Sequence, residues 1–428
     1  MNNFSPHVSA NSTPQGLSVP KQAYAWLVIS LCAFFLFYKY VLQVSPSVMT
    51  QDLMSAFGVN GAGLGNLAAT YFYAYLVVQL IAGPLLDRFS PRYLTVVAIG
   101  VCALGAFAFA TTQSLFAAGL ARALMGAGAA FATVSYLKMS ALWFRADQVA
   151  FVDGLLASAA MIGALCGQVP LTLMVDNAGW RDSLVYCGVF GGVLALLFLL
   201  TVKDRGPIVQ TANAPRPLIR WQDILALLKT KKNWLLALYS GLAFTPVAVL
   251  GGLWGNPFFE EAHHLTTTEA ASFTSLLFLG VAIGSPLLGY LADRAHARLT
   301  VMIVGTGIAL VSLMLVIYVV SLPLWLFGTL LFIFGLGTGV FMLSYPLGKE
   351  LNYLGLAATV VAFINTGDAL LGSFTEPVIG KLLDFFWQGK VVNGAHYFST
   401  LDYQLALSLL PIYLLVALGC LCLLKKAQ

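Results

Sequence analysis

Three ionisable side chains, Lys39, Arg122 and Asp368, lie deep inside long apolar runs of this sequence. Each ionised group at the centre of a bilayer costs roughly 2.5–3.5 kcal/mol, so we expect these groups to face a cavity or one another. Lys39 is predicted to contact a carboxylate or phosphate of a substrate, and the alternative is a lysine that snorkels to the interface. It lies about nine residues, roughly 13 Å, from the end of its run, and this depth favours the substrate contact.

Polar side chains follow helical faces beside these charges. Lys39 and Gln43 lie four residues apart and share one face, and Tyr71, Tyr75 and Gln79 form a second stripe at the same spacing. The second stripe predicts a hydrogen-bonding wall of a cavity. The alternative is polar contact between neighbouring helices.

A third stripe runs through the segment that holds Asp368. Asn365, Asp368, Gly372 and Glu376 recur at helical spacing on one face. A carboxylate in the middle of a span can be charged or neutral, depending on the side to which a cavity opens. Asp368 is therefore predicted to carry a proton, with Glu376 as a second candidate. The alternative is a carboxylate that only pairs with one of the deep cations.

The chain as a whole is poor in charge. Its 428 residues include 22 Lys and Arg and 17 Asp and Glu, so that 9% are charged and 59% are hydrophobic, and the mean hydropathy is +0.86. Ordinary soluble domains carry about 25% charged residues. This composition excludes a soluble enzyme, a nucleic-acid binder and a disordered scaffold.

Long apolar runs predict an all-α membrane protein with twelve transmembrane helices. A span needs about 20 apolar residues, and these runs are too long and too rich in Gly for barrel strands. Residues 1–22 are predicted to be a disordered cytoplasmic tail without a signal peptide, 23–202 and 233–428 two six-helix bundles, and 203–232 a cytoplasmic linker. The runs are 24–48, 63–86, 93–112, 115–140, 149–175, 183–202, 233–258, 270–292, 299–320, 324–347, 356–384 and 404–424.

Basic residues orient these helices. With both termini in the cytoplasm, sixteen Lys and Arg residues fall inside, and only Arg181 and Lys390 fall in outside loops. This bias follows the positive-inside rule and supports an even number of spans. The inside set is Lys21, Arg88, Arg92, Arg145, Lys203, Arg205, Arg216, Arg220, Lys229, Lys231, Lys232, Arg294, Arg298, Lys349, Lys425 and Lys426.

An internal repeat relates the two predicted bundles. A Gly-x3-Asp-Arg-x3-Arg pattern occurs twice at an offset of 206 residues, both times between the second and third helices of a half. Its charges can latch the cytoplasmic ends of the bundles in one state, and two such bundles around a midplane site are typical of secondary transporters. Lys349 and Glu350 are predicted to join this gate or to form a surface pair. The repeated residues are Gly83, Asp87, Arg88 and Arg92, and then Gly289, Asp293, Arg294 and Arg298.

With two six-helix bundles and this repeat, essentially the whole chain resembles the major facilitator superfamily. The loop at 83–92 is similar to the cytoplasmic-loop signature of that superfamily, except at Ser90 and Pro91, where a Gly and a basic residue are usual. Arg122-x3-Gly126-x-Gly128 resembles the fourth-helix signature, which implies that Arg122 contacts substrate or tunes a proton site; the alternative is a structural ion pair. The fifth-helix signature of drug exporters is absent from 154–170, which argues against a multidrug antiporter.

A narrower resemblance is to the phagosomal nutrient transporters of intracellular bacteria. It implies uptake of amino acids or nucleosides, although related branches handle siderophores, and it adds Trp254 and Asn365 to the predicted substrate site. The segments that carry it are Ser45–Met49, Tyr71–Tyr75, Gln79, Trp143-Phe144, Gly179–Arg181, Leu253–Gly255, Tyr345–Asn352, Asn365–Gly367 and Leu383-Asp384.

These features predict a monomeric secondary transporter of the bacterial inner membrane, driven by protons and taking up an amino acid or nucleoside. The alternative substrate is an anion, such as a carboxylate siderophore or another organic anion, because two deep cations have few carboxylates nearby in the sequence. We expect no cofactor, no metal and no nucleic acid, since the chain has no phosphate-binding Gly-x4-Gly-Lys loop and its cysteines show no metal spacing. An intramembrane enzyme or a channel would leave the internal repeat unexplained.

Overall fold

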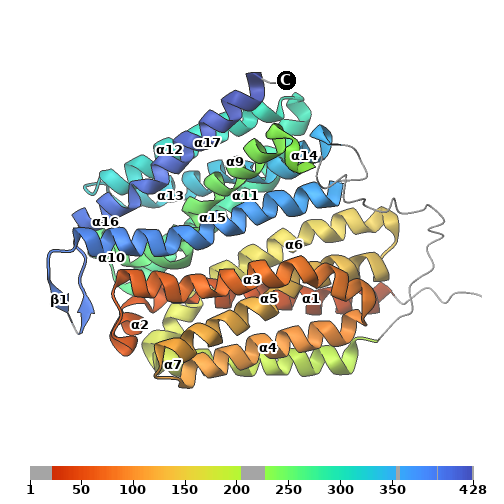
Figure 1. The fold of residues 1–428 in the computed structure, drawn as a ribbon, viewed down its shortest axis with the longest axis horizontal. Coiled ribbons are helices and arrows are strands. Elements are labelled where there is room, and N and C mark those ends of the chain that lie inside the picture. Colours follow the sequence, from red (N-terminus) through yellow and green to blue (C-terminus); the bar gives the residue numbers. More distant parts are fainter. Residues whose placement is uncertain (1–21, 204–226, 353–356, 393, 427–428) are drawn as a thin grey trace, which may run out of the picture.

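Long helices lie side by side in the computed structural model, which describes residues 22–203, 227–352, 357–392 and 394–426 (Figure 1). The first half of the chain contains α1 (Gln22–Val44), η1 (Ser45–Val48), α2 (Thr50–Phe57), α3 (Gly61–Arg88), α4 (Pro91–Thr111), α5 (Leu115–Trp143), α6 (Ala146–Cys166) and α7 (Val169–Thr201).

The second half follows the same plan and adds one short hairpin. It contains α9 (Lys231–Val249), η2 (Leu250–Trp254), α10 (Gly255–His263), α11 (Thr267–Ala295), α12 (Arg298–Tyr318), α13 (Leu324–Thr338), η3 (Gly339–Leu343), α14 (Ser344–Leu351), α15 (Ala357–Phe386), β1 (Val391–Val392), β2 (Ala395–His396), α16 (Thr400–Leu407) and α17 (Leu409–Lys426). The two strands pair antiparallel, with Val391 opposite His396.

The helices account for the twelve predicted crossings. Ten segments of the described chain are long and apolar enough to span a membrane, and one of them, Leu155–Thr201, has 47 residues. A single helix of that length would measure roughly 70 Å, against about 30 Å of hydrocarbon. It contains two crossings, because the chain turns back at Gly179, where φ is 81° (Figure 1). With the 30-residue helix α15, which covers the predicted eleventh run, the all-α membrane fold is confirmed.

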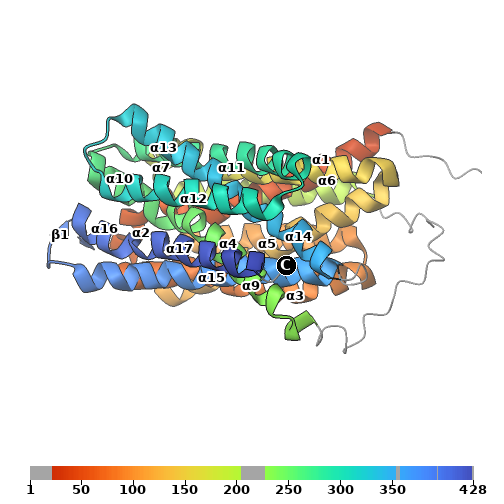
Figure 2. The same cartoon turned by 90° about the horizontal axis from the view of Figure 1, so that it is seen from above.

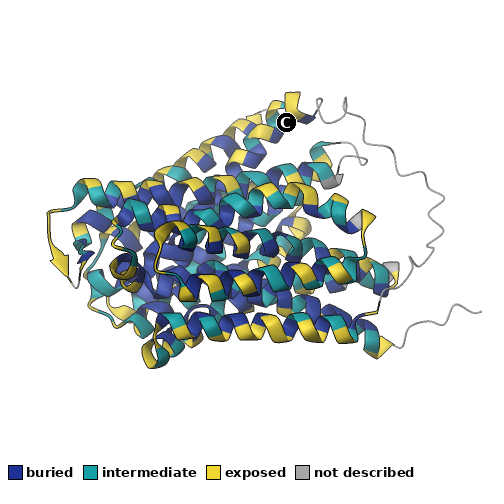
Figure 3. Cartoon of the chain, turned by 60° about the horizontal axis from the view of Figure 1, so that its bottom comes forward, coloured by how far each residue is buried: buried dark blue, intermediate teal, exposed yellow. Residues whose placement is uncertain are grey.

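The outer surface of the helix layers is apolar. Figure 3 shows exposed residues along the outward faces of the helices and buried residues between them. Large side chains such as Leu80, Phe116 and Trp325 are each more than two-thirds exposed. Such a surface is suited to lipid, and it agrees with the low charge of the sequence.

The two ends of the molecule differ, as Figures 1 and 2 show. We call one the hairpin end, because the β1–β2 hairpin, α2, α10 and α16 lie there, and the other the terminus end, because α1 begins and α17 ends there. The sequence predicts that the terminus end faces the cytoplasm. The predicted tail and most of the predicted linker, residues 1–21 and 204–226, lie outside the described residues, so the predicted domain boundaries stay a prediction.

The halves approach most closely where α3 crosses α15 at the hairpin end. A Cβ atom at Gly65 would lie 2.6 Å from the carbonyl oxygen of Glu376, and one at Gly380 would lie 2.2 Å from the carbonyl oxygen of Gly61. Only glycine permits this approach, as at other small-residue helix contacts in membranes. Toward the terminus end, α3 and α15 diverge (Figure 1).

Substitution of Gly65 by Ala tests this contact. The added methyl group must push α15 away, and such overpacking costs typically about 1–3 kcal/mol, so Gly65→Ala is expected to lower the melting temperature in detergent. Gly192→Ala is the matched control, because it is also a helical glycine and nothing lies within 4 Å of its added Cβ. Equal melting temperatures for the two variants would contradict the close contact.

Candidate functional site

A cavity of about 140 Å³ lies between the halves and is lined by residues of both. It brings together six of the residues predicted to bind substrate or protons: Lys39, Gln43, Tyr71 and Tyr75 from the first half, and Asn365 and Asp368 from the second. The other lining residues are Tyr40, Phe72, Met161, Phe244, Ala248, Val281, Phe341, Met342, Tyr345, Ala369 and Gly372. Cavities at this position, between two bundles, are where secondary transporters hold substrate.

Lys39 is the cation of the cavity. Its side chain is buried, and Nζ lies 4.4 Å from the ring centroid of Tyr40 and 4.7 Å from that of Tyr75. Aromatic faces attract an ammonium group but do not neutralise it. Lys39 forms no ion pair with any carboxylate of the described residues. Its positive charge is therefore directed at the cavity and its aromatic wall.

Asp368 is the carboxylate of the cavity and comes from the opposite half. The hydroxyl of Tyr345 donates to its Oδ2 at 2.6 Å and lies 3.5 Å from Oδ1 of Asn365. The other oxygen of Asp368, Oδ1, is also buried. Tyr345 was missed as a site residue by the sequence analysis, although it stands in a segment quoted for the narrower resemblance.

Arg122 lies behind the cavity wall. It is 1% exposed, its Nη1 donates to the carbonyl of Leu42 at 2.8 Å, and its guanidinium carbon lies 5.1 Å from the ring centroid of Tyr71. Its Nε and Nη2 atoms have no hydrogen-bond partner in the described chain. Tyr71 thus lies between the guanidinium group and the cavity, so Arg122 acts on the cavity through its field unless Tyr71 moves.

Glu376 follows Asp368 on α15, closer to the hairpin end, and it does not line the cavity. It is 2% exposed, and its Oε2 atom has no partner among the described residues. Its backbone carbonyl accepts a hydrogen bond from Nε1 of Trp254 at 3.1 Å. The buried cations Lys39 and Arg122 thus belong to the first half, and the carboxylates Asp368 and Glu376 belong to the second. No direct ion pair joins these four groups in the described chain.

Besides Arg122, two further predicted substrate contacts are not in the cavity wall. Trp254 is fully buried in η2, a π-helical segment, and its indole packs against the backbone of α15. Gln79 is half-buried on α3, beyond the cavity. The helical stripe of Tyr71, Tyr75 and Gln79 is correct as a shared face, but the cavity extends along only part of it.

The predicted gate residues lie at the terminus end. In the second half, Nη2 of Arg298 donates to Asp293 at 2.7 Å, and the same guanidinium group forms an ion pair with Glu350, which joins α12 to α14. Arg294 lies 3.4 Å from the hydroxyl of Tyr290, and Lys349 is exposed.

In the first half, Nη2 of Arg92 donates to the carbonyl of Leu199 at 2.5 Å, and Arg88 lies over the ring of Phe89. The side chain of Asp87 lies outside the described residues. A Cβ at Gly83 or Gly289 would meet nothing within 4 Å, so neither glycine makes a close helix contact in this conformation.

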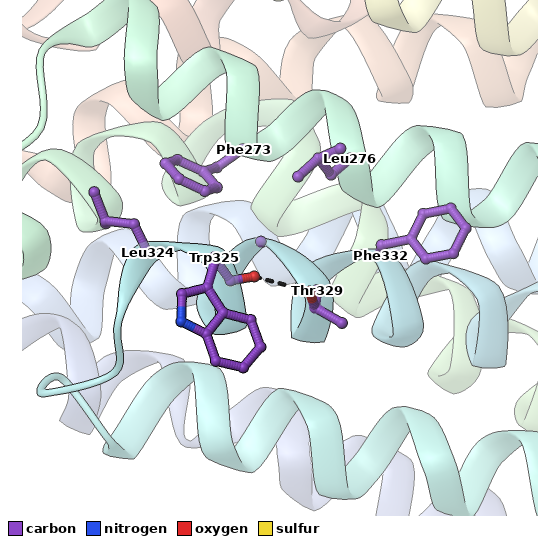
Figure 4. Close-up of a pocket in the computed structure, with 7 residues that line it drawn as sticks. Phe273, Leu276, Leu324, Trp325, Thr329 and Phe332 are labelled. Carbon is purple, nitrogen blue, oxygen red and sulfur yellow. Dashed lines mark hydrogen bonds between the residues drawn. The ribbon is translucent and has the colours of Figure 1, made fainter.

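A second, apolar groove lies between α11 and α13 on the outer surface (Figure 4). Phe273 and Leu276 line it from α11, and Trp325 and Phe332 from α13. The hydroxyl of Thr329 is already donated to the carbonyl of Trp325 at 2.8 Å. The groove has few polar groups with which to hold a polar substrate, so the cavity between the halves is the candidate transport site.

Comparison with protein families agrees with this geometry. The model of the Major Facilitator Superfamily matches residues 27–375. A solved structure of a bacterial homolog of the human lysosomal transporter Spinster, inward-facing and unoccupied, superposes with a TM-score of 0.82 at 14% identity and covers 95% of this chain and 98% of that one.

Three curated relatives are similar over much of the chain. The uncharacterized transporter YybO of Bacillus subtilis (strain 168) is 24% identical over 65% of this chain and 69% of its own length. The probable sulfoacetate transporter SauU of Cupriavidus necator is 21% identical over 84% and 87%. The probable L-galactonate transporter of Escherichia coli (strain K12) is 26% identical over 60% and 58%.

The protein is therefore a multi-pass membrane transporter rather than an enzyme. It belongs to the Major Facilitator Superfamily.

Removal of the Tyr345 hydroxyl tests the architecture of the site. Tyr345→Phe leaves a buried carboxylate without its donor, which costs about 1–3 kcal/mol, so the melting temperature is expected to fall. Tyr318→Phe is the matched control, because its hydroxyl donates to Ser408 at 2.8 Å in an exposed position. If both variants unfold at the same temperature, the Tyr345–Asp368 bond does not stabilise this state.

Proposed function

We propose that the protein carries a small organic anion across the bacterial inner membrane by alternating access, together with protons. The observation that carries this proposal is the buried ammonium group of Lys39, which faces the cavity and has no carboxylate partner in the described chain. An unpaired buried cation is costly, and a substrate carboxylate that binds beside it would offset that cost.

The relatives support an anion over the neutral nutrients that the sequence favoured. SauU is named for sulfoacetate and the Escherichia coli relative for L-galactonate, and both substrates are anions. The size of the cavity also favours a small substrate. It holds about 140 Å³, whereas drug-sized ligands occupy pockets of roughly 300–1,000 Å³, so a siderophore is less suitable.

A zwitterionic amino acid or a nucleoside is the second candidate. Asp368 and Asn365 lie on the wall that comes from the second half, so an ammonium or hydroxyl group of such a substrate would find acceptors opposite Lys39. This arrangement is the feature that supports the narrower resemblance to phagosomal nutrient transporters.

Protonation of Asp368 offers a physical route to coupling. When Asp368 is charged, its field opposes an anion that enters the same cavity, and a proton on this carboxylate removes that repulsion. Anion and proton would then bind with positive cooperativity, which is the thermodynamic basis of symport. Protonation of Glu376 would act in the same way, because a neutral Glu376 no longer offsets the positive field that Arg122 exerts on the anion. We also propose that the terminus end is cytoplasmic and that one chain is the transporting unit.

Replacement of Lys39 tests the substrate class. Lys39→Ala is expected to reduce uptake of an anionic substrate about tenfold or more, because it removes a charge-assisted bond, while the protein still folds and inserts. Uptake is measured by counterflow into proteoliposomes preloaded with sulfoacetate, aldonates, amino acids or nucleosides. Lys390→Ala is the control, because Lys390 lies over the ring of Tyr397 beside the hairpin, away from the cavity. Unchanged anion counterflow in Lys39→Ala would remove Lys39 from the site.

Replacement of Asp368 tests proton coupling. Asp368→Asn keeps the hydrogen bond with Tyr345 but cannot exchange a proton, so counterflow is expected to continue while accumulation driven by a pH gradient disappears. Glu376→Gln is measured in parallel to separate the two carboxylates. Proton-driven accumulation that persists in Asp368→Asn would exclude Asp368 as the carrier.

A further inference from the structure

The carboxylate of Asp384 in the last turn of α15 caps the first turn of α3 in the other half. The backbone N–H of Gly61 donates to its Oδ1 at 2.9 Å, and that of Ala62 donates to its Oδ2 at 2.7 Å. The first turn of a helix has free N–H groups and a partial positive charge, so a carboxylate is its best partner. This contact joins residues more than 320 positions apart in the chain.

Local contacts hold Asp384 in this position. Nδ1 of His396 lies 3.3 Å from its Oδ1, and the imidazole of His396 stacks on Trp387 with ring centroids 3.7 Å apart. The side chain of Asn60 accepts from the N–H of Gly63, so it does not compete for the two N–H groups that Asp384 receives. The β1–β2 hairpin thus positions the carboxylate against α3.

A second set of bonds crosses between the halves around Gln168, which is fully buried. Its Nε2 donates to Oγ of Ser47 at 3.1 Å and to the carbonyl of Gly251 at 2.9 Å, and its Oε1 accepts from Nδ2 of Asn256 at 2.9 Å. Oδ1 of Asn256 in turn accepts from Thr274. Ser47 and Gln168 belong to the first half, and the other three residues belong to the second.

The π-helical segment η2 helps to provide this contact. The N–H of Gly255 donates to the carbonyl of Leu250 rather than to that of Gly251, so the Gly251 carbonyl is released from the regular helical pattern. π-Helical turns of this kind often occur at functional positions. Here the released carbonyl accepts from a residue of the other half.

We infer that Asp384 and Gln168 form a two-part latch that keeps the hairpin end closed and the cavity directed toward the terminus end. Neither residue lines the cavity. All the bonds that cross between the halves at these residues must break when the hairpin end opens, so their strength contributes to the ratio of the two states. A ligand or mutation shifts such a ratio only by its difference in free energy between the states.

Distances between spin labels at the hairpin end measure this ratio. One label is placed at Gln113 in the first half and one at Leu401 in the second, both exposed, in a background without the six native cysteines. Asp384→Asn and Gln168→Leu are each expected to raise the fraction of molecules with the longer distance about tenfold, since bonds to charged or buried groups are lost. The purified full chain is measured without substrate, so the outcome is independent of the proposed substrate.

Two matched controls keep their bonds within the second half. Glu269 accepts from the backbone N–H of Thr266 at its own helix start, and the amide of Gln404 donates to the carbonyl of Ile317 at 2.9 Å. Glu269→Gln and Gln404→Leu should therefore leave the distance distribution of the parent unchanged. If Gln168→Leu fails to fold, Asp384→Asn decides alone, because its side chain is partly exposed. A parental distribution in Asp384→Asn and in any folded Gln168→Leu would overturn the inference.

Discussion

Lys39, Arg122, Asp368 and Glu376 are buried around the cavity inside a bundle of apolar helices, and the described chain contains no direct ion pair among these four groups. Lys39 and Arg122 instead contact aromatic faces and a carbonyl, and Asp368 accepts from the hydroxyl of Tyr345. Direct pairs in such a place would be costly to separate, because breaking a buried pair by removing one partner costs about 3–5 kcal/mol. The cations belong to one half and the carboxylates to the other. Because Lys39, Arg122 and Asp368 have neutral partners instead of an opposite charge, the halves can separate without breaking a buried ion pair.

The contacts that hold the two halves together lie elsewhere, at the hairpin end. There the contacts are glycine packing between α3 and α15 and hydrogen bonds from side chains to backbone, such as those of Asp384 and Gln168. When the halves part, water replaces such bonds at a net loss of roughly 0.5–1.5 kcal/mol for each neutral bond and about 1.5–3 kcal/mol for each bond to a charged group. The molecule thus combines a contact that can open reversibly with a site whose charges stay separate.

The sequence alone could predict the fold, and it drew attention to Lys39 and Asp368, which line the cavity, because a charge within an apolar run stands out. Helical spacing also predicted that Tyr71 and Tyr75 share one face, and both line the cavity, but it could not show that Tyr71 covers Arg122. Trp254 entered the predicted site through the narrower resemblance, which could not show that its indole would donate to the backbone carbonyl of Glu376 outside the cavity wall. Neutral polar residues such as Tyr345 and Gln168 were missed, since Ser, Thr, Asn, Gln and Tyr are common between membrane helices and only their neighbours identify a role.

Protonation of the buried carboxylates can change the net charge around the cavity even where the substrate does not touch them. With Lys39, Arg122, Asp368 and Glu376 all ionised, two positive and two negative charges cancel, whereas protonation of Asp368 and Glu376 leaves a net charge of two positive units. Coulomb forces extend farther in a low-dielectric interior than in water, so an anion beside Lys39 would sense the protonation of both carboxylates. On the proposed mechanism, a proton gradient therefore favours anion binding through the electric field of the site. Glu376 lies outside the cavity wall, so its contribution to that field depends on its distance from the bound anion.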